Sequence, residues 1–169
     1  SWDLTIGSPV FFFFLTNASV TVGNIDVQDT SSLTLQNLKS VSVSGTTDIA
    51  SGASLNMQSV GAVGMGNVNA YGVFEVESVQ LNQADNTTTT GGFSVGNLYL
   101  ASGANISAAG DVNITGDLQN SSVGSSVDIV SGGNIFVAGS LENSGTNMTI
   151  SNGALTVNGA MKNDYFDGN

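Results

Sequence analysis

Short triplets of an apolar, a polar and an apolar residue recur along almost the whole chain. Examples are Val20-Thr21-Val22, Val41-Ser42-Val43, Val112-Asn113-Ile114 and Leu155-Thr156-Val157. In a strand, this alternation places the outer residues of each triplet on one face and the middle residue on the other. Gly, Ser, Asn and Asp separate the triplets and favour tight turns. The pattern predicts a nearly all-β protein of short strands, and no comparable stretch has helical spacing.

The triplets belong to longer phrases that repeat at a regular interval. VNITGDLQN from Val112, IFVAGSLEN from Ile135 and LTVNGAMKN from Leu155 align without gaps, at offsets of 23 and 20 residues. The phrase SGASLNM at residues 51–57 also returns as SGANISA, SGGNIFV and SNGALTV. A repeat of about 20–23 residues with several short strands is typical of one coil of a parallel β-helix. We therefore predict a β-solenoid of about eight rungs, stacked at about 4.8 Å.

The alignment also predicts the interior of the solenoid and its boundaries. Residues 1–17 form an apolar segment that acts as a cap or an assembly strand, 18–163 form the solenoid, and 164–169 form a tail. The largest insertion between strands is expected at 82–92, which is polar and ends in two glycines. The residues expected to face the interior are Leu33, Leu35, Leu55, Met57, Val112, Ile114, Ile135, Val137, Leu155 and Val157.

Two of these phrases carry a resemblance to a known group of proteins. SGGNIFVAGSLENSG and NGALTVNGAMKN resemble coils of bacterial filamentous-haemagglutinin-type exoproteins and autotransporter passenger domains. The resemblance covers residues 18–162. It implies a right-handed β-helix that is displayed at a cell surface.

Composition and charge exclude several classes of partner and site. The formal net charge is −11, with no arginine or histidine and with Lys39 and Lys162 as the only basic side chains. Nucleic acids and anionic membrane surfaces are therefore unsuitable partners, because both require a basic surface. The chain has no cysteine, which excludes disulfides and zinc-thiolate sites. We expect no cofactor and no transmembrane segment.

The apolar run PVFFFFL at residues 9–15 is far shorter than the roughly 18–20 residues that cross a bilayer. It lacks the basic region of a secretion signal, so if the protein is exported, the signal was removed or lies outside this sequence. Successive phenylalanines alternate faces in a strand, and one solenoid covers only one of those faces. We therefore predict an assembly contact between copies, made by Val10, Phe11, Phe12, Phe13, Phe14 and Leu15.

Two groups of acidic residues are candidates for chemistry. Glu75 and Glu77 project together from one strand, as a carboxylate pair for glycosidic chemistry would. The favoured interpretation places both in solvent while Phe74 and Val76 face the core, and it predicts no enzyme activity. Asp164, Asp167 and Asn169 offer oxygen ligands for calcium, but a polar end cap or a connection to a neighbouring subunit is favoured, so we expect no metal.

Asparagine supplies two further sets of candidates. Asn120, Asn143 and Asn163 end the three aligned phrases and are candidates for a ladder of side-chain amides along one corner. Sequons for N-glycosylation occur at six positions, which are candidates for modification only if the source glycosylates exported proteins. They are Asn17, Asn86, Asn105, Asn113, Asn120 and Asn147.

These features favour a secreted, non-enzymatic structural protein at the cell surface. We expect a β-solenoid subunit that assembles with copies of itself into a filament or sheath, because open solenoid ends polymerise unless capped. An alternative is an adhesin passenger fragment, a rod whose loop at 82–92 contacts host or matrix glycans or proteins. A more distant third is a polysaccharide-acting β-helix enzyme. A filament subunit elongates when purified alone, whereas an adhesin rod stays monomeric.

Overall fold

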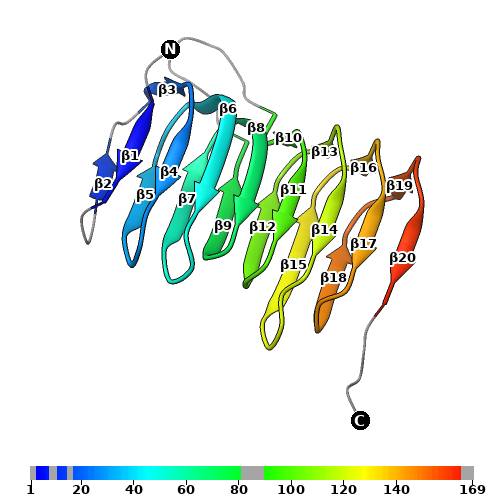
Figure 1. The fold of residues 1–169 in the computed structure, drawn as a ribbon. Helices are drawn as coiled ribbons and strands as arrows, with labels where there is room; N and C mark the ends of the chain where they lie inside the picture. Colours follow the sequence, from blue (N-terminus) through cyan, green and yellow to red (C-terminus); the bar gives the residue numbers. More distant parts are fainter. Residues whose placement is uncertain (1–2, 8–10, 15–16, 81–89, 165–169) are drawn as a thin grey trace.

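The chain folds into a stack of rungs that follow one another from β1 and β2 at one end to β19 and β20 at the other (Figure 1). This computed structural model describes residues 3–7, 11–14, 17–80 and 90–164, without the side chains of 11–14. The strands of each rung pair in parallel with those of the rungs before and after it. The fold is the predicted all-β parallel solenoid. Among the described residues no helix is long and apolar enough to cross a membrane.

The strands form three columns, which we call faces 1, 2 and 3. Face 1 contains β3 (Ser19–Val22), the first halves of β6 (Ser40–Ile49) and β8 (Val63–Ala70), β10 (Phe93–Val95), β13 (Val112–Ile114), β16 (Ile135–Val137) and β19 (Leu155–Val157). Face 2 contains β1 (Leu4–Ile6), β4 (Ile25–Val27), the second halves of β6 and β8, β11 (Leu98–Leu100), β14 (Leu118–Asn120), β17 (Leu141–Asn143) and β20 (Met161–Asn163). Face 3 contains β2 (Phe11–Phe14), β5 (Ser32–Gln36), β7 (Ser54–Val60), β9 (Val73–Ser78), β12 (Ala104–Ala108), β15 (Ser126–Ser131) and β18 (Asn147–Ser151).

Faces 1 and 2 belong to one 13-stranded sheet because β6 and β8 run through the corner between them, and face 3 is a separate seven-stranded sheet. β1 and β2 stack on β4 and β5, so residues within the N-terminal segment contribute to the first rung. The predicted insertion at 82–92 falls between β9 and β10, where most of it lies outside the described residues.

The core consists of apolar side chains in register on successive rungs. Val112, Ile135 and Leu155, for example, are aligned on face 1. Eight of the ten predicted interior residues are buried: Leu33, Leu35, Leu55, Met57, Val112, Ile114, Ile135 and Val137. Leu155 and Val157 keep the interior register, but Leu155 is 37% exposed and Val157 is half-buried. Both lie in the last rung, where no described strand covers them.

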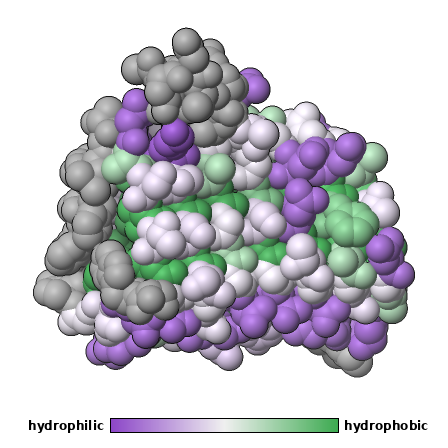
Figure 2. Space-filling view, turned by 90° about the horizontal axis from the view of Figure 1, so that it is seen from above, coloured by the Kyte–Doolittle hydropathy of each residue, from purple (hydrophilic) through white to green (hydrophobic). Residues whose placement is uncertain are grey.

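Small polar side chains cover much of the outside of the rod. On face 1 the outward row includes Thr21, Ser42 and Ser94, with Gly64 between the two serines. Figure 2 shows this face from above, with pale and apolar rows along its middle and hydrophilic residues along its margins. The surface is thus hydrated mainly by uncharged groups, in agreement with a chain of which only 9% is charged.

The corner between faces 1 and 2 carries a glycine on successive rungs. The N–H of Gly116 donates to the carbonyl of Gly96 at 3.0 Å, and Gly139 and Gly159 repeat this contact with the preceding glycine at 2.9 Å. Cβ atoms do not fit where the backbones approach so closely. At Gly66, for example, a Cβ would overlap the Gly45 carbonyl oxygen.

The residue after each of these glycines forms what we call the corner ladder. Its side-chain oxygen accepts the backbone N–H of the equivalent residue on the next rung. Asn97 Oδ1 accepts from Asp117 at 2.8 Å, Asp117 Oδ1 from Ser140 at 2.7 Å and Ser140 Oγ from Ala160 at 3.3 Å. Corner N–H groups that no strand pairs with are thereby satisfied, and the hydrogen bonds all run in one direction along the rod.

Candidate functional site: the C-terminal end of the solenoid

The last rung presents the strand edges of all three faces. β18, β19 and β20 pair with β15, β16 and β17 on one side. On the other side, no strand among the described residues pairs with them. Unpaired backbone donors and acceptors of this kind are a template for another strand.

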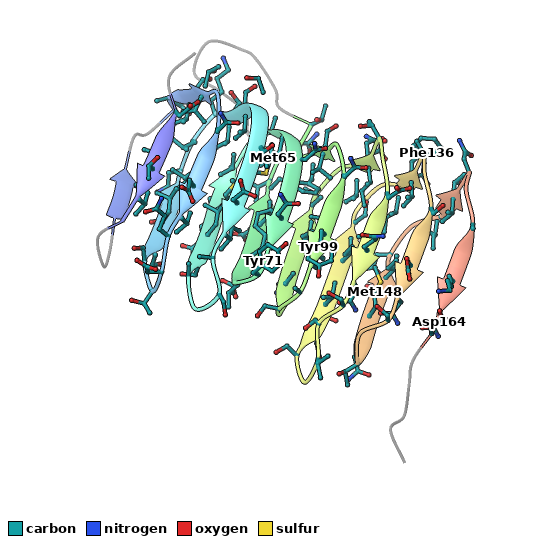
Figure 3. The ribbon with its side chains drawn as sticks, viewed as in Figure 1. Met65, Tyr71, Tyr99, Phe136, Met148 and Asp164 are labelled. Carbon is teal, nitrogen blue, oxygen red and sulfur yellow. The ribbon has the colours of Figure 1, made fainter. Side chains whose placement is uncertain are left out.

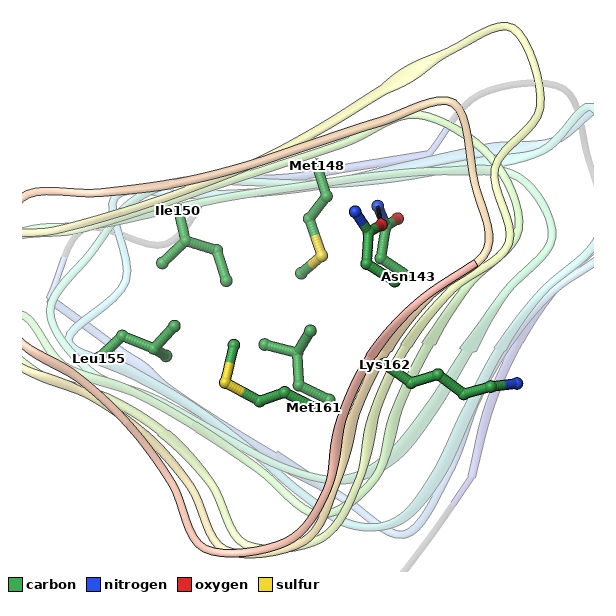
Figure 4. Close-up of a pocket in the computed structure, with 8 residues that line it drawn as sticks. Asn143, Met148, Ile150, Leu155, Met161 and Lys162 are labelled. Atoms are coloured by element: carbon green, nitrogen blue, oxygen red, sulfur yellow. Dashed lines mark hydrogen bonds between the residues drawn. The ribbon is translucent and has the colours of Figure 1, made fainter. Parts of the chain in front are cut away.

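The interior of the solenoid opens at this end into a hollow of about 300 Å³. Figure 4 shows Met148, Ile150, Leu155 and Met161 pointing into the hollow from different sides of the rung. Met161 is 66% exposed, whereas Leu141, its partner on the preceding rung, is 6% exposed. Core-type side chains thus form an exposed apolar surface, which commonly marks an interaction site.

The predicted asparagines lie above one another at the corner between faces 2 and 3. Asn120 Nδ2 donates to Asn143 Oδ1 at 2.7 Å, and Asn143 Nδ2 donates to Asn163 Oδ1 at 2.8 Å. Asn120 is 1% exposed, and its Oδ1 accepts the backbone N–H of Ser122 at 2.9 Å. We call this column the amide ladder. It ends at Asn163, beside the hollow.

The cation at this end is Lys162, which points outward, away from the hollow (Figure 4). Its Nζ lies 3.5 Å from Glu142 Oε1 and also pairs with the Asp164 carboxylate. A hydrogen bond to Asp164, together with the charges of Asp164 and Glu142, raises the pKa of Lys162 above its ordinary value. Asp164 marks the far end of the described chain in Figure 3. Asp164 is one of the three candidate calcium ligands, and its carboxylate pairs with Lys162. The other two candidates, Asp167 and Asn169, lie outside the described residues.

Two corners of the last rung lack a side-chain acceptor. Ala160 occupies the position that Asp117 and Ser140 hold in the corner ladder. At the corner between faces 3 and 1, Asp111 Oδ1 accepts the N–H of Asn134 at 2.7 Å, and Ala154 follows one rung later. A strand that stacked on this end would therefore find backbone groups, the Asn163 amide and the apolar hollow.

At the opposite end, the phenylalanine run forms β2, which pairs with β5 on face 3. Phe11 is in register with Leu33, and Phe13 with Leu35. Val10 and Leu15 lie outside the described residues, so the predicted assembly contact stays a prediction.

Glu75 and Glu77 lie on the outer side of β9, with Phe74 and Val76 buried beneath them. The Glu75 carboxylate accepts a hydrogen bond from Asn56 Nδ2 at 3.0 Å. Glu77 accepts the backbone N–H of Ser59 at 3.2 Å, at the point where the pairing between β7 and β9 shifts register. Ser59 has a φ of 53°, so Glu77 stabilises a bulge, a role that alternation alone does not indicate.

No group of three or more His, Cys, Asp or Glu side chains in the described ranges could hold a metal.

The sequons differ in accessibility. Asn17, Asn105, Asn113 and Asn147 are exposed, whereas Asn120 is buried in the amide ladder. Asn86 lies outside the described residues.

An aromatic pair that we did not predict lies on the outside of face 2. The rings of Tyr71 and Tyr99 make an edge contact there, with 5.5 Å between their centroids (Figure 3).

Comparisons of this chain with protein-family models, with curated proteins and with solved structures found no match. The fold and the geometry of the described residues are therefore the basis of the functional proposals.

Proposed function

We propose that this protein is a secreted structural subunit that polymerises end to end into a filament or sheath at the cell surface. One observation carries the proposal: the last rung leaves the strand edges of three faces and the hollow at Met161 and Leu155 uncovered among the described residues. Covering such a surface with another rung buries apolar area and pairs backbone groups at the same time.

The occupant that we propose for this end is the first rung of a second copy. β1, β2 and β3 lie in the same three columns as β20, β18 and β19, so a second copy offers a matching outline and strands of the same direction. Charge also favours this pairing. The outward row of face 2 begins with Thr5 followed by Asp26 and Asp48, and it ends with Lys162. Head-to-tail stacking therefore brings the cation of one copy toward the acidic end of the next.

The test is the state of the purified protein, observed by negative-stain microscopy and by sedimentation at increasing concentration. We expect the wild type to form fibres. Leu155→Lys together with Met161→Lys should prevent fibre growth, because two ammonium groups would have to enter an apolar interface. Val123→Lys is the matched control, since Val123 is an apolar residue with 85% exposure that does not line the hollow. A wild-type protein that stays monomeric at every concentration would exclude the proposal.

The second candidate function is an adhesin rod, which the monomeric outcome would favour. The observation that supports it is the exposed ring of Tyr71, which is 54% exposed beside Tyr99. Exposed tyrosines are frequent in recognition surfaces because one side chain combines apolar area with a hydroxyl. A glycan or protein array with the wild type and Tyr71→Ser would test this alternative directly.

A further inference from the structure

The sequence contains two Asn-Gly pairs, and both lie in the last rung. Asn152–Gly153 is at the corner between β18 and β19, and Asn158–Gly159 is at the corner between β19 and β20. All four residues are exposed. The two pairs are thus alike in sequence and in contact with water, and they differ in their backbone environments. Any difference in their reactivity in the folded protein can therefore be assigned to the backbone.

The backbone holds Asn158–Gly159 in place. The Gly159 N–H donates to the Gly139 carbonyl at 2.9 Å, and the Asn158 N–H donates to the Val137 carbonyl at 3.0 Å. The Gly159 nitrogen belongs to the stacked glycines of the corner, so it can leave its position only if the corner opens locally.

The environment of Asn152–Gly153 is different. Asn152 has a φ of 62° and Gly153 a φ of 133°, both in the left-handed region. Within the described part of the chain, neither the Gly153 N–H nor the Asn152 side-chain amide has a hydrogen-bond partner. No hydrogen bond therefore opposes movement of the Gly153 nitrogen toward the Asn152 side chain.

We propose that Asn152 is a site of spontaneous deamidation in the folded protein and that Asn158 is protected from the same reaction. Hydroxide removes the proton from the Gly153 nitrogen, which then attacks Asn152 Cγ. The new N–Cγ bond forms as the Cγ–Nδ2 bond breaks, and the amide nitrogen takes a proton from water and leaves as ammonia. Water then opens the cyclic imide at either carbonyl, giving aspartyl or isoaspartyl at position 152. No oxidation or reduction is involved. Glycine favours the attack because it has no side chain to obstruct the nitrogen.

The product changes the end of the solenoid. Either form adds a carboxylate to a chain whose net charge is already −11. The isoaspartyl form also lengthens the backbone between β18 and β19. Gly153 packs closely enough on the preceding rung that a Cβ there would overlap the Gly133 carbonyl oxygen. The longer corner must therefore move outward, which loosens two strands of the last rung.

The experiment compares the two pairs within one protein. The wild type is incubated at mildly alkaline pH, folded or unfolded in guanidinium chloride, and the product at each asparagine is measured by peptide mapping with mass spectrometry. In the unfolded chain we expect similar rates at both pairs. In the folded protein we expect Asn152 to react at least about tenfold faster than Asn158, which corresponds to a local opening of about 1.4 kcal/mol at the Gly159 corner.

Two variants complete the test. Asn152→Gly suits a positive φ and should abolish most of the ammonia released by the folded protein, whereas Asn158→Gly should leave the release unchanged. Equal rates at the two pairs in the folded protein, a faster reaction at Asn158, or no reaction at Asn152 while the unfolded chain reacts would each overturn the proposal.

Discussion

The rung formed by β13, β14 and β15 and the last rung, formed by β18, β19 and β20, use nearly the same phrase in different situations. VNITGDLQN forms β13 and β14, the strands of faces 1 and 2 in the middle rung. LTVNGAMKN forms β19 and β20, the equivalent strands of the last rung. Val112 and Leu118 are 0% exposed, whereas Leu155 and Met161 are 37% and 66% exposed. The triplet therefore determines which side chain faces inward, but burial requires a neighbouring rung on both sides.

The two rungs also differ at their corners. Asp117 and Asp111 accept backbone N–H groups from the next rung, whereas Ala160 and Ala154 at the equivalent corners have no side-chain oxygen to offer. The middle rung is thus fixed by its apolar core and by polar corner contacts. The last rung instead offers a neighbour its strand edges, the hollow, the Asn163 amide and the charge of Lys162.

The largest expected effect contrasts equivalent apolar positions in the two rungs. Leu118→Asp should cost at least about 4 kcal/mol in the free energy of unfolding, because it buries an unpaired charge. In the monomeric protein, Met161→Asp should change the free energy of unfolding by less than about 1 kcal/mol, because the carboxylate stays in water. Urea denaturation of the wild type and of these two variants checks the difference.

The cost of Leu155→Asp in the free energy of unfolding should lie between the costs of Leu118→Asp and Met161→Asp. Sequence alone predicts a cost of several kcal/mol for this change, but the partial exposure of Leu155 lowers that expectation. Equal costs at Leu118 and Met161 would show that the last rung is covered in solution.

The next effect contrasts two glycines of one strand, β8. Gly66→Ala should destabilise the protein by about 1–3 kcal/mol, because the new Cβ would overlap the backbone of the preceding rung and neither backbone can give way easily. Gly64→Ala should change the free energy of unfolding by about 0.5 kcal/mol or less, since nothing lies within 4 Å of its new Cβ. Thermal unfolding of the two variants distinguishes them, and a similar loss in both would contradict the close contact at the corner.

Along the amide ladder, the cost of an alanine substitution should decrease from the buried asparagine to the exposed one, and the difference should be smaller than the one between Leu118→Asp and Met161→Asp. Asn120→Ala should cost about 1–3 kcal/mol, because it leaves the N–H of Ser122 without its buried acceptor. Asn163→Ala should be nearly neutral, since Asn163 lies exposed at the end of the ladder. Chemical denaturation measures both, and a larger loss from Asn163→Ala than from Asn120→Ala would contradict the gradient.

The smallest effect concerns Lys162. Its raised pKa means that the folded state holds the proton more tightly, so the stabilisation is complete below the ordinary lysine value of about 10.4 and is lost as the pH rises through the raised value. The free energy of unfolding should therefore fall slightly faster in alkali for the wild type than for Lys162→Gln. Because the Lys162 side chain is exposed to water, the difference should be small and should shrink further in high salt.

The sequence predicted the strands and the interior residues well because period-two alternation is a local property. Ile114 and Val137 are recognisable from their own triplets alone. The amide ladder candidates were recognisable for a similar reason, since Asn120, Asn143 and Asn163 occupy one column of an ungapped alignment. The exposure of Leu155 was not predictable, because it depends on a neighbouring rung and not on the triplet.

The corner ladder was missed for a different reason. Its members are Asn, Asp and Ser, so no single residue type marks the column, and the spacing varies from 30 residues between Asn67 and Asn97 to 20 between Asn97 and Asp117. The glycine before each member is the signal that could have revealed it. The role of Glu77 at the Ser59 bulge was also invisible, because a bulge interrupts the alternation on which the prediction depended.

The parallel stacking of the rungs has a mechanical consequence. When the first and last rungs are pulled apart, the force acts along the hydrogen bonds that join neighbouring rungs, so the rod should peel one rung at a time. A released rung of about 20–23 residues adds roughly 70 Å of contour length at 3.3–3.6 Å per residue. The interval of 30 residues between Asn67 and Asn97 should give one longer step of roughly 100 Å. In a single-molecule stretching experiment, one long interval within an otherwise even sawtooth would locate the insertion along the rod.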